Sequence, residues 1–200
     1  MELNKIVSTE KDSLKRLLAL EISVKRFRSR LSLFLEKDFY RDWEPHLRLM
    51  TIPPKTLLKD VLSQFEPVAR QKSCTLTMQC PDQSLPLMGD FVYLSECLGR
   101  LVQNAITYTP RGGQVQLLFR ESSESHQFSV LDNGIGISKE NLSRVFSPCF
   151  RADNAINKEN EGLGLGLWIA TRIAEAHKGK LVVESDLGQG SNFTLLLFKR

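Results

Sequence analysis

A glycine-rich segment that runs into a predicted helix suits a phosphate. Residues 162–167 read Gly-Leu-Gly-Leu-Gly-Leu. Glycine-rich backbone at a helix N-terminus leaves N–H groups free, and the helix dipole adds positive potential there. The segment is not a Walker motif, because no Gly-Lys-Ser/Thr follows, and no strand leads into it as a dinucleotide fingerprint requires. The alternative is that Leu163, Leu165 and Leu167 are simply core residues.

A carboxylate followed by two glycines lies at the end of an apolar strand. Asp132-Asn133-Gly134-Ile135-Gly136 comes directly after Phe128 to Leu131. A carboxylate at a strand end can accept a hydrogen bond from an exocyclic amine, and glycines let the backbone approach a flat ligand closely. The alternative is an ordinary Asp-Asn-Gly turn.

Asn104 lies within a predicted helix, in Leu101-Val102-Gln103-Asn104-Ala105. Its amide offers an oxygen to a hard cation without adding charge, and Mg²⁺ takes few protein ligands, usually alongside substrate phosphates. The sequence therefore offers Asn104 as a Mg²⁺ ligand. The alternative is a helix-surface or capping asparagine.

The elements that must position these residues mix helices and strands without strict β-α-β alternation. This pattern predicts an α+β fold, a two-layer sandwich whose sheet is covered by helices on one face. The predicted helices are 55–70, 90–108, 139–146 and 163–177, and the predicted strands are 75–80, 85–88, 114–121, 126–131, 180–185 and 192–198. Residues 151–161 are polar and predict a loop.

The N-terminal part differs in character. Residues 9–38 contain no Gly or Pro, and apolar residues recur at alternating spacings of three and four: Leu17, Leu20, Val24, Phe27, Leu31 and Phe34. This heptad seam is typical of a helix that packs on partner helices. We therefore expect a helix and linker over 1–50, with a homodimer through that helix, and a second domain over 51–200.

The composition is that of a globular protein. Of the 200 residues 42% are hydrophobic and 25% charged, and the net charge of +4 does not argue for nucleic acid. No apolar run is long enough to insert in a membrane, and the start lacks the apolar stretch of a signal peptide. The four cysteines form no CxxC pair, which predicts reduced thiols in a cytoplasmic protein.

Taken in this order, the segments resemble the ATP-binding catalytic domain of sensor histidine kinases. That domain has the Bergerat fold, shared with DNA gyrase B, Hsp90 and MutL. The resemblance covers about residues 52–200. The matching positions are Asn104 (N box), 132–136 (G1 box), Phe146 and Phe150 (F box), 162–166 (G2 box), Tyr108-Thr109-Pro110, Ala176-His177-x-Gly179, and Ser185 to Phe193.

The resemblance implies a site for ATP and Mg²⁺. Asp132 would bind the adenine amine, Asn104 would bind Mg²⁺, and Arg151 would approach the γ-phosphate from a lid over 147–161. Asn104 and Arg151 would be the catalytic residues. The implied nucleotide contacts are Asn104, Tyr108, Asp132, Gly134, Gly136, Ile137, Phe150, Arg151, Gly162, Leu163, Gly164, Leu165, Gly166, Leu167 and Ser191.

The sequence departs from the family pattern near the expected metal. One turn before Asn104 the family has Asn, or a catalytic Glu in the related ATPases, but here it is Arg100. The missing carboxylate argues against self-contained ATP hydrolysis, with Glu96 as an alternative one turn earlier. Thr107 replaces a frequent Lys, and Glu161 replaces a frequent Gly.

The family's phosphoacceptor histidine has no match. Only His46, His126 and His177 occur; His46 lacks the adjacent acid, and His177 is expected to be structural. The expected function is therefore transfer of the ATP γ-phosphoryl to a histidine outside this chain. The partners would be an acceptor helix of the same or a partner kinase chain and a response regulator. The alternatives are a weakly catalytic nucleotide-sensing or partner-binding module, and a serine kinase of the anti-sigma type.

Overall fold

The computed structural model describes residues 47–151 and 163–199, together with Leu20 and Val24. The chain divides into two units, residues 1–41 and 42–200. In the first unit, Leu20 and Val24 are helical, and the rest of the predicted heptad helix lies outside the described residues. So do His46, Glu161, Gly162 and most of the predicted loop. Within the described part, no helix has the length and apolar character needed to cross a membrane.

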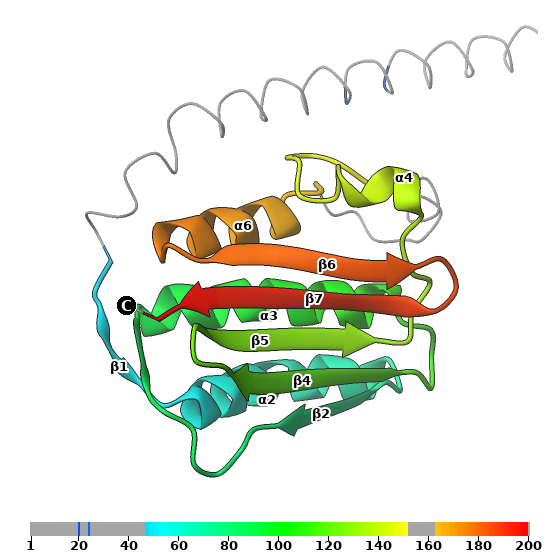
Figure 1. Cartoon of the computed structure of the whole chain (residues 1–200). Helices are drawn as coiled ribbons and strands as arrows, with labels where there is room; N and C mark the ends of the chain where they lie inside the picture. The colour runs from blue at the N-terminus through cyan, green and yellow to red at the C-terminus, as the bar shows by residue number, and fades with distance from the viewer. Residues whose placement is uncertain (1–19, 21–23, 25–46, 152–162, 200) are drawn as a thin grey trace, which may run out of the picture. The chain divides into compact units, whose positions relative to one another are not determined.

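A five-stranded sheet forms one layer of the second unit (Figure 1). Its order is β2-β4-β5-β7-β6; β2 runs parallel to β4, and the other neighbours are antiparallel. The strands are β2 (Thr75–Gln79), β4 (Gln114–Glu121), β5 (Ser125–Asp132), β6 (Lys180–Asp186) and β7 (Gly190–Phe198). Each of these predicted strands is therefore confirmed, to within one or two residues.

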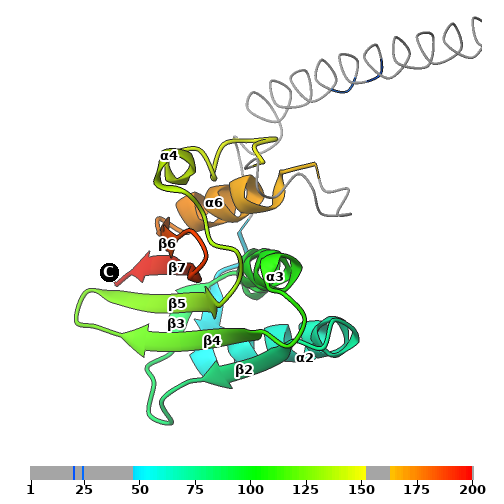
Figure 2. The ribbon, with the colours of Figure 1, turned by 90° about the vertical axis from the view of Figure 1, so that its right-hand side faces the viewer.

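Three helices pack on the sheet and form the second layer: α2 (Pro54–Gln71), α3 (Phe91–Tyr108) and α6 (Gly166–Ala176). They lie on the same side of the strands, as Figures 1 and 2 show. Phe119, Phe128 and Phe193 are fully buried, and the rings of Phe119 and Phe128 lie 4.8 Å apart. The predicted two-layer α+β sandwich is confirmed.

A second, two-stranded sheet pairs β1 (Met50–Ile52) with β3 (Leu87–Gly89), antiparallel. Strand β3 agrees with the predicted strand at 85–88, but β1, at the boundary between the expected linker and the second domain, was not predicted. A three-residue strand ended by Pro53 and Pro54 is too short to show a pattern in sequence.

Helix α3 has a defined start and end. Asp90, which is buried, caps its start by accepting hydrogen bonds from the backbone N–H groups of Val92 and Tyr93 at 3.0 and 3.2 Å. At the other end, Lys72 Nζ donates to the carbonyl oxygens of Ile106 and Thr107, the latter at 2.6 Å. A cation here interacts favourably with the helix dipole. Both ends of α3 are therefore held by groups from outside the helix.

Two of the predicted helices are shorter than expected. Helix α6 begins at Gly166 rather than at 163, because Gly164 has a φ of +74°, which is outside the right-handed helical region. Helix α4 covers only Lys139–Leu142. Beyond it the backbone makes turns: the N–H of Arg144 bonds to Asn141 O and that of Ser147 to Arg144 O, three residues back. A bond to the third residue back closes a turn tighter than an α-helix.

Helices α3 and α6 pack antiparallel, and two hydrogen bonds fix their register. The backbone N–H of Asp90, at the start of α3, donates to Nε2 of His177, at the end of α6, over 3.0 Å. The Cys97 thiol donates to the carbonyl oxygen of Ala170 over 3.5 Å. The middle of α3 therefore lies beside the N-terminal end of α6.

Candidate functional site

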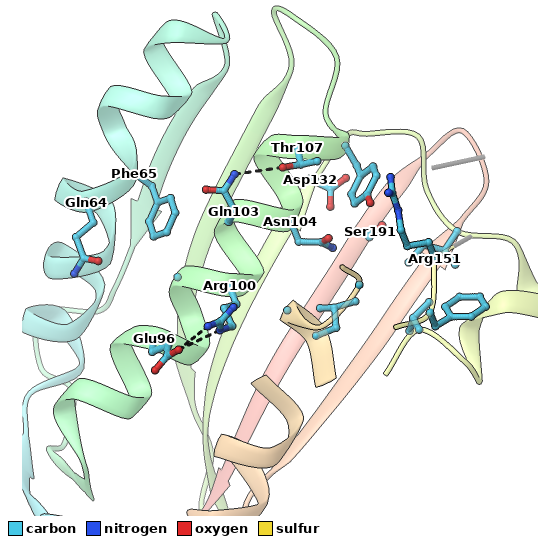
Figure 3. A pocket seen from close by; sticks show the side chains of 18 of the residues that line it. Gln64, Phe65, Glu96, Arg100, Gln103, Asn104, Thr107, Asp132, Arg151 and Ser191 are labelled. Carbon is cyan, nitrogen blue, oxygen red and sulfur yellow. Dashed lines mark hydrogen bonds and ion pairs between the residues drawn. The ribbon is translucent and has the colours of Figure 1, made fainter. Parts of the chain in front are cut away.

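A cavity of about 840 Å³ opens where α3 meets the start of α6. It is bordered by α3, the turn after β5, the turns after α4, and one residue of β7. The predicted site residues that line it are Asn104, Tyr108, Asp132, Gly136, Ile137, Phe150, Arg151, Gly164, Gly166, Leu167 and Ser191. Segments far apart in the sequence thus meet at one place, as Figure 3 shows for the labelled side chains.

Of the predicted residues that the structure describes, three do not line the cavity. Gly134 is buried behind it: a Cβ there would lie 2.6 Å from the Tyr108 carbonyl oxygen and 2.7 Å from Asp132 Oδ1. Leu163 is 45% exposed, and Leu165 is half-buried. Since none of Leu163, Leu165 and Leu167 is buried, the reading of this segment as a set of core leucines is wrong.

Asp132 is the last residue of β5, so its side chain lies at the edge of the sheet that faces the cavity. Its Oδ1 accepts the backbone N–H of Gly134 over 2.8 Å. Burial raises the pKa of Asp132 above its usual value, against a lowering effect of the backbone N–H groups of Gly134 and Ser191. A partly desolvated carboxylate of this kind gains from a further donor, such as an amine of a bound ligand.

In the turn after Asp132, position 136 has room for glycine only. Gly136 has a φ of +65°, and a Cβ there would lie 2.0 Å from the carbonyl oxygen of Asp186. The N–H of Ile135 bonds to the carbonyl oxygen of Tyr108, at the end of α3, over 3.2 Å. The Asp-Asn-Gly turn is therefore present, and it ties the end of β5 to α3 at the edge of the cavity.

Asn104 projects from α3 toward the middle of the cavity (Figure 3). One turn earlier on α3, Arg100 also lines the cavity and pairs with Glu96; Nη2 and Oε1 are 2.7 Å apart. In the described part of the chain, no group of three or more His, Cys, Asp or Glu side chains could hold a metal ion. The donor set around Asn104 therefore fits a Mg²⁺ that is held mainly by phosphate oxygens and water, not a metal in an all-protein site.

The N-terminal end of α6 faces the cavity without a side-chain cap. Leu165 is at the N-cap position and makes no capping hydrogen bond, and Gly166 and Leu167 line the cavity. Free N–H groups at the first turn of a helix suit an anion. The chain enters α6 through Gly164. No side chain fits at this position, because a Cβ there would lie 2.7 Å from the carbonyl oxygen of Phe150.

Residues 144–151 close one side of the cavity. The Arg144 guanidinium lies over the Phe150 ring, 4.6 Å from its centre, and Phe146 meets the core residue Phe193 edge to face at 6.3 Å. Arg151 lines the cavity beyond them. The rest of the predicted lid, 152–161, lies outside the described residues.

Neither described histidine is placed as a phosphoryl acceptor. His177 packs between α6 and α3, with Nδ1 2.8 Å from the carbonyl oxygen of Ile173 and Nε2 on the N–H of Asp90. His126 is 7% exposed and stacks on Phe119. Burial lowers the pKa of both imidazoles, so each is held in its neutral form. The structural role expected for His177 agrees with its position at the end of α6.

The sequence did not predict the part of the cavity near α2. Gln64 and Phe65 of α2, and Phe91, Val92 and Ser95 at the start of α3, also line it. Ser95 Oγ donates to Asp60 Oδ2 over 2.5 Å, which links α3 to α2 there. Helical spacing from Asn104 places Val92 and Glu96 on the face of Arg100, but no sequence signal indicated that α2 would border that face.

Comparisons with known proteins agree with this architecture. The family model of histidine kinase-, DNA gyrase B- and HSP90-like ATPases matches residues 89–200, more than half of the chain. Sensor-like histidine kinase SenX3 of Mycobacterium tuberculosis is 37% identical over 142 residues, 71% of this chain and 34% of that protein. Sensor histidine kinase WalK of Bacillus subtilis is 32% identical over 171 residues, 84% of this chain and 26% of that protein.

A solved structure gives the same result at the level of the fold. Full-length ShkA in complex with AMPPNP superposes with a TM-score of 0.68 at 27% identity, covering 76% of this chain and 31% of that chain. This chain therefore spans about a third or less of the length of each of these three proteins. By sequence and by fold, the chain belongs to the family of histidine kinase-, DNA gyrase B- and HSP90-like ATPases.

Proposed function

We propose that the chain binds ATP with Mg²⁺ in the cavity between α3 and α6 and acts as the catalytic domain of a sensor histidine kinase. The observation that carries this proposal is the gathering of Asp132, Asn104, Arg151 and the uncapped N-terminus of α6 around one cavity. Asp132 suits a purine amine and Asn104 a metal ion. Arg151 and the N-terminus of α6 suit phosphate oxygens. The relatives named sensor histidine kinases support the same reading.

The ligand would lie with its base at the C-terminal end of α3. Asp132 would accept a hydrogen bond from the adenine amine there, with Tyr108, Gly136, Ile137 and Ser191 around the ring. The glycine segment from Gly162 to Leu167 would shape the part of the cavity that holds the phosphates. The backbone N–H of Gly134 would hold the Asp132 carboxylate in place. Bound Mg²⁺, held by the phosphates and the Asn104 amide oxygen, would neutralise part of the phosphate charge.

In the transfer step, a histidine nitrogen of the acceptor helix would form a bond to the γ-phosphorus while the bond to the β–γ bridging oxygen breaks. ADP would leave with the bond's electron pair. Arg151 would offset the charge spread over the transferring phosphoryl oxygens. Because the position one turn before Asn104 is Arg100 and not a carboxylate, activation of water has no base there, which favours transfer over hydrolysis.

The partners and the domain division follow from the family. The acceptor helix would belong to the same kinase or to a partner chain, and a response regulator would take the phosphoryl group from it. Residues 1–50 would supply a helix and linker, with a homodimer through the helix, and residues 51–200 would form the catalytic domain in the cytoplasm.

Titration with an ATP analogue tests the proposal. Replacing Asp132 by Ala should weaken binding by about 1–3 kcal/mol, the cost of leaving a buried polar partner unpaired. Asp82→Asn is the matched control, since Asp82 is an exposed residue paired with Lys55 outside the cavity. Equal affinity of the Asp132 variant and the wild type would contradict the proposal.

A second candidate function is a nucleotide-sensing or partner-binding module with little catalysis. The Arg100–Glu96 pair inside the cavity favours it, because this pair changes the charge near the metal. Adding an acceptor-helix protein with radiolabelled ATP separates the two: an acid-labile phosphoprotein supports the kinase, and binding without transfer supports the module. An acid-stable product would indicate a serine kinase instead.

A further inference from the structure

The cavity continues past Asn104 toward the start of α3, where Arg100 and Glu96 line it. Figure 3 shows the two side chains together on the side of Asn104 away from Thr107. Arg100 Nε and Nη2 both donate to Glu96 Oε1, at 3.3 and 2.7 Å. Four residues advance a helix by about 6 Å, so Tyr108, Asn104 and Arg100 mark successive depths of the cavity along α3.

The register of α3 against α6 places Arg100 beside the first turn of α6. From Asp90 to Cys97 on α3, and from His177 to Ala170 on α6, the two hydrogen bonds advance by the same number of residues in opposite directions. Three residues further along α3, from Cys97 to Arg100, correspond to three residues back along α6, from Ala170 to Leu167. Leu167 lines the cavity in the uncapped first turn of α6. A guanidinium and the N-terminal end of α6, where the helix dipole is positive, therefore border the same space.

We propose that Arg100 is a phosphate ligand that leaves Glu96 when a nucleotide binds and supplies charge neutralisation that would otherwise come from Mg²⁺ alone. This inference rests on the proposed nucleotide site. It predicts that, without metal, the chain binds a nucleoside triphosphate with higher affinity than a variant that lacks this arginine.

The pair with Glu96 is weak enough to exchange. The two side chains are 36% and 39% exposed, and ion pairs between exposed charges contribute little to stability. A phosphate offers the planar guanidinium a bidentate partner of higher charge. Once Arg100 turns to phosphate, the Glu96 carboxylate stays nearby and opposes the phosphate charge. Glu96 therefore competes for Arg100 in the empty site and lowers the affinity of the filled one.

The test is calorimetric titration of the whole chain with AMPPNP, ADP and adenosine, each in Mg²⁺ and in EDTA. Arg100→Gln removes the charge and keeps much of the side-chain length. Arg120→Gln is the matched control, because Arg120 is an exposed arginine of β4 outside the cavity. In EDTA, the Arg100 variant should lose affinity for AMPPNP by about tenfold or more, as expected for a charge-assisted hydrogen bond. Its affinity for adenosine should not change.

Glu96→Gln gives the opposite expectation. It frees Arg100 and removes the repulsion, so affinity for AMPPNP should rise in both buffers. If Glu96→Gln instead weakens binding only in Mg²⁺, Glu96 is a metal ligand and the inference is wrong. It is also overturned if wild type and Arg100→Gln lose the same affinity on chelation.

The proposed function has a separate sign of failure. If the wild type binds none of the three ligands, or if Asp132→Ala leaves adenosine affinity unchanged, the nucleotide site itself is wrong. If adenosine binding depends on Asp132 but Arg100→Gln has no effect with either phosphate ligand, only the role of Arg100 is lost.

Discussion

Nε2 of His177 accepts the backbone N–H of Asp90 over 3.0 Å, which joins the end of α6 to the start of α3. Asp90 in turn caps α3 and accepts the backbone N–H of Arg48 over 2.8 Å. Because Nδ1 of the same ring lies 2.8 Å from the carbonyl oxygen of Ile173, the neutral tautomer with its proton on Nδ1 satisfies both contacts. The imidazole therefore fixes the packing of the two helices that border the cavity.

This contact predicts a pH dependence of stability. Burial lowers the pKa of His177 in the folded state, so the unfolded state binds a proton first as the pH falls. The contribution of His177 is fully present above its unfolded pKa of about 6.5 and is lost as the pH falls through the lower folded value. Urea unfolding between about pH 8 and about pH 5 should show this loss in the wild type and a smaller one in His177→Gln. All other titrating groups are the same in the two proteins. An equal loss of unfolding free energy in both would therefore contradict the contribution assigned to His177.

Two glycines with similar φ values separate backbone strain from steric overlap. Gly136 (φ +65°) would place a Cβ 2.0 Å from the Asp186 carbonyl oxygen, whereas Gly112 (φ +79°) has nothing within 4 Å. Gly112→Ala should therefore cost only about 1 kcal/mol, the left-handed backbone penalty. Gly136→Ala should cost clearly more, because backbone must also move. The free energies of unfolding in urea provide the measurement, and equal costs would show that the turn adjusts freely.

Asn104→Ala should affect nucleotide binding only when metal is present. An amide oxygen is a ligand for Mg²⁺ and has no positive charge to offer a phosphate. ADP titrations in Mg²⁺ should therefore show weaker binding by the variant than by the wild type. In EDTA the two proteins should bind ADP with equal affinity. A loss of equal size in both buffers would mean that Asn104 binds the nucleotide directly.

Cys97 should be the slowest thiol to react in the folded protein. Its side chain is fully buried between α3 and α6, and burial raises its pKa to about 12. The thiolate is the reactive form, so iodoacetamide should reach Cys97 only on unfolding. Cys80 and Cys149, which are half-buried, should react before it. Mass spectrometry of peptides from briefly labelled protein would show the order, and early labelling of Cys97 would contradict it.

Much of the fold could be predicted because its signals are local. Helix α3 is bounded by a capping Asp90 and by Pro110, and β4 and β5 form a hairpin of two apolar strands. Helix α6 was predicted too long because the apolar spacing continues through Leu163 and Leu165, while the left-handed Gly164 interrupts the backbone. The spacing of apolar side chains gives no information on the backbone φ angle at a glycine between them.

The candidate site was predictable to the extent that each residue type suits the ligand proposed for it. Asp132, Asn104 and Arg151 do line one cavity, although nothing local in the sequence relates their positions. The α2 border at Gln64 and Phe65 depends on how two helices pack, and the pairing of Arg100 with Glu96 competes with any role for either side chain in metal binding. Such relationships appear only when the elements are assembled.

The antiparallel packing of α3 and α6 gives the cavity a built-in direction. The end of α3, with its partial negative charge, is covered by the Lys72 ammonium on one side and borders the Asp132 turn on the other. The start of α6 has the opposite charge. A ligand with a neutral, donor-bearing ring and an anionic tail can satisfy both helix ends in one orientation only. Reversed entry would set the anion against the Asp132 carboxylate and the negative end of α3, so the helix polarity and this side chain disfavour the same wrong orientation.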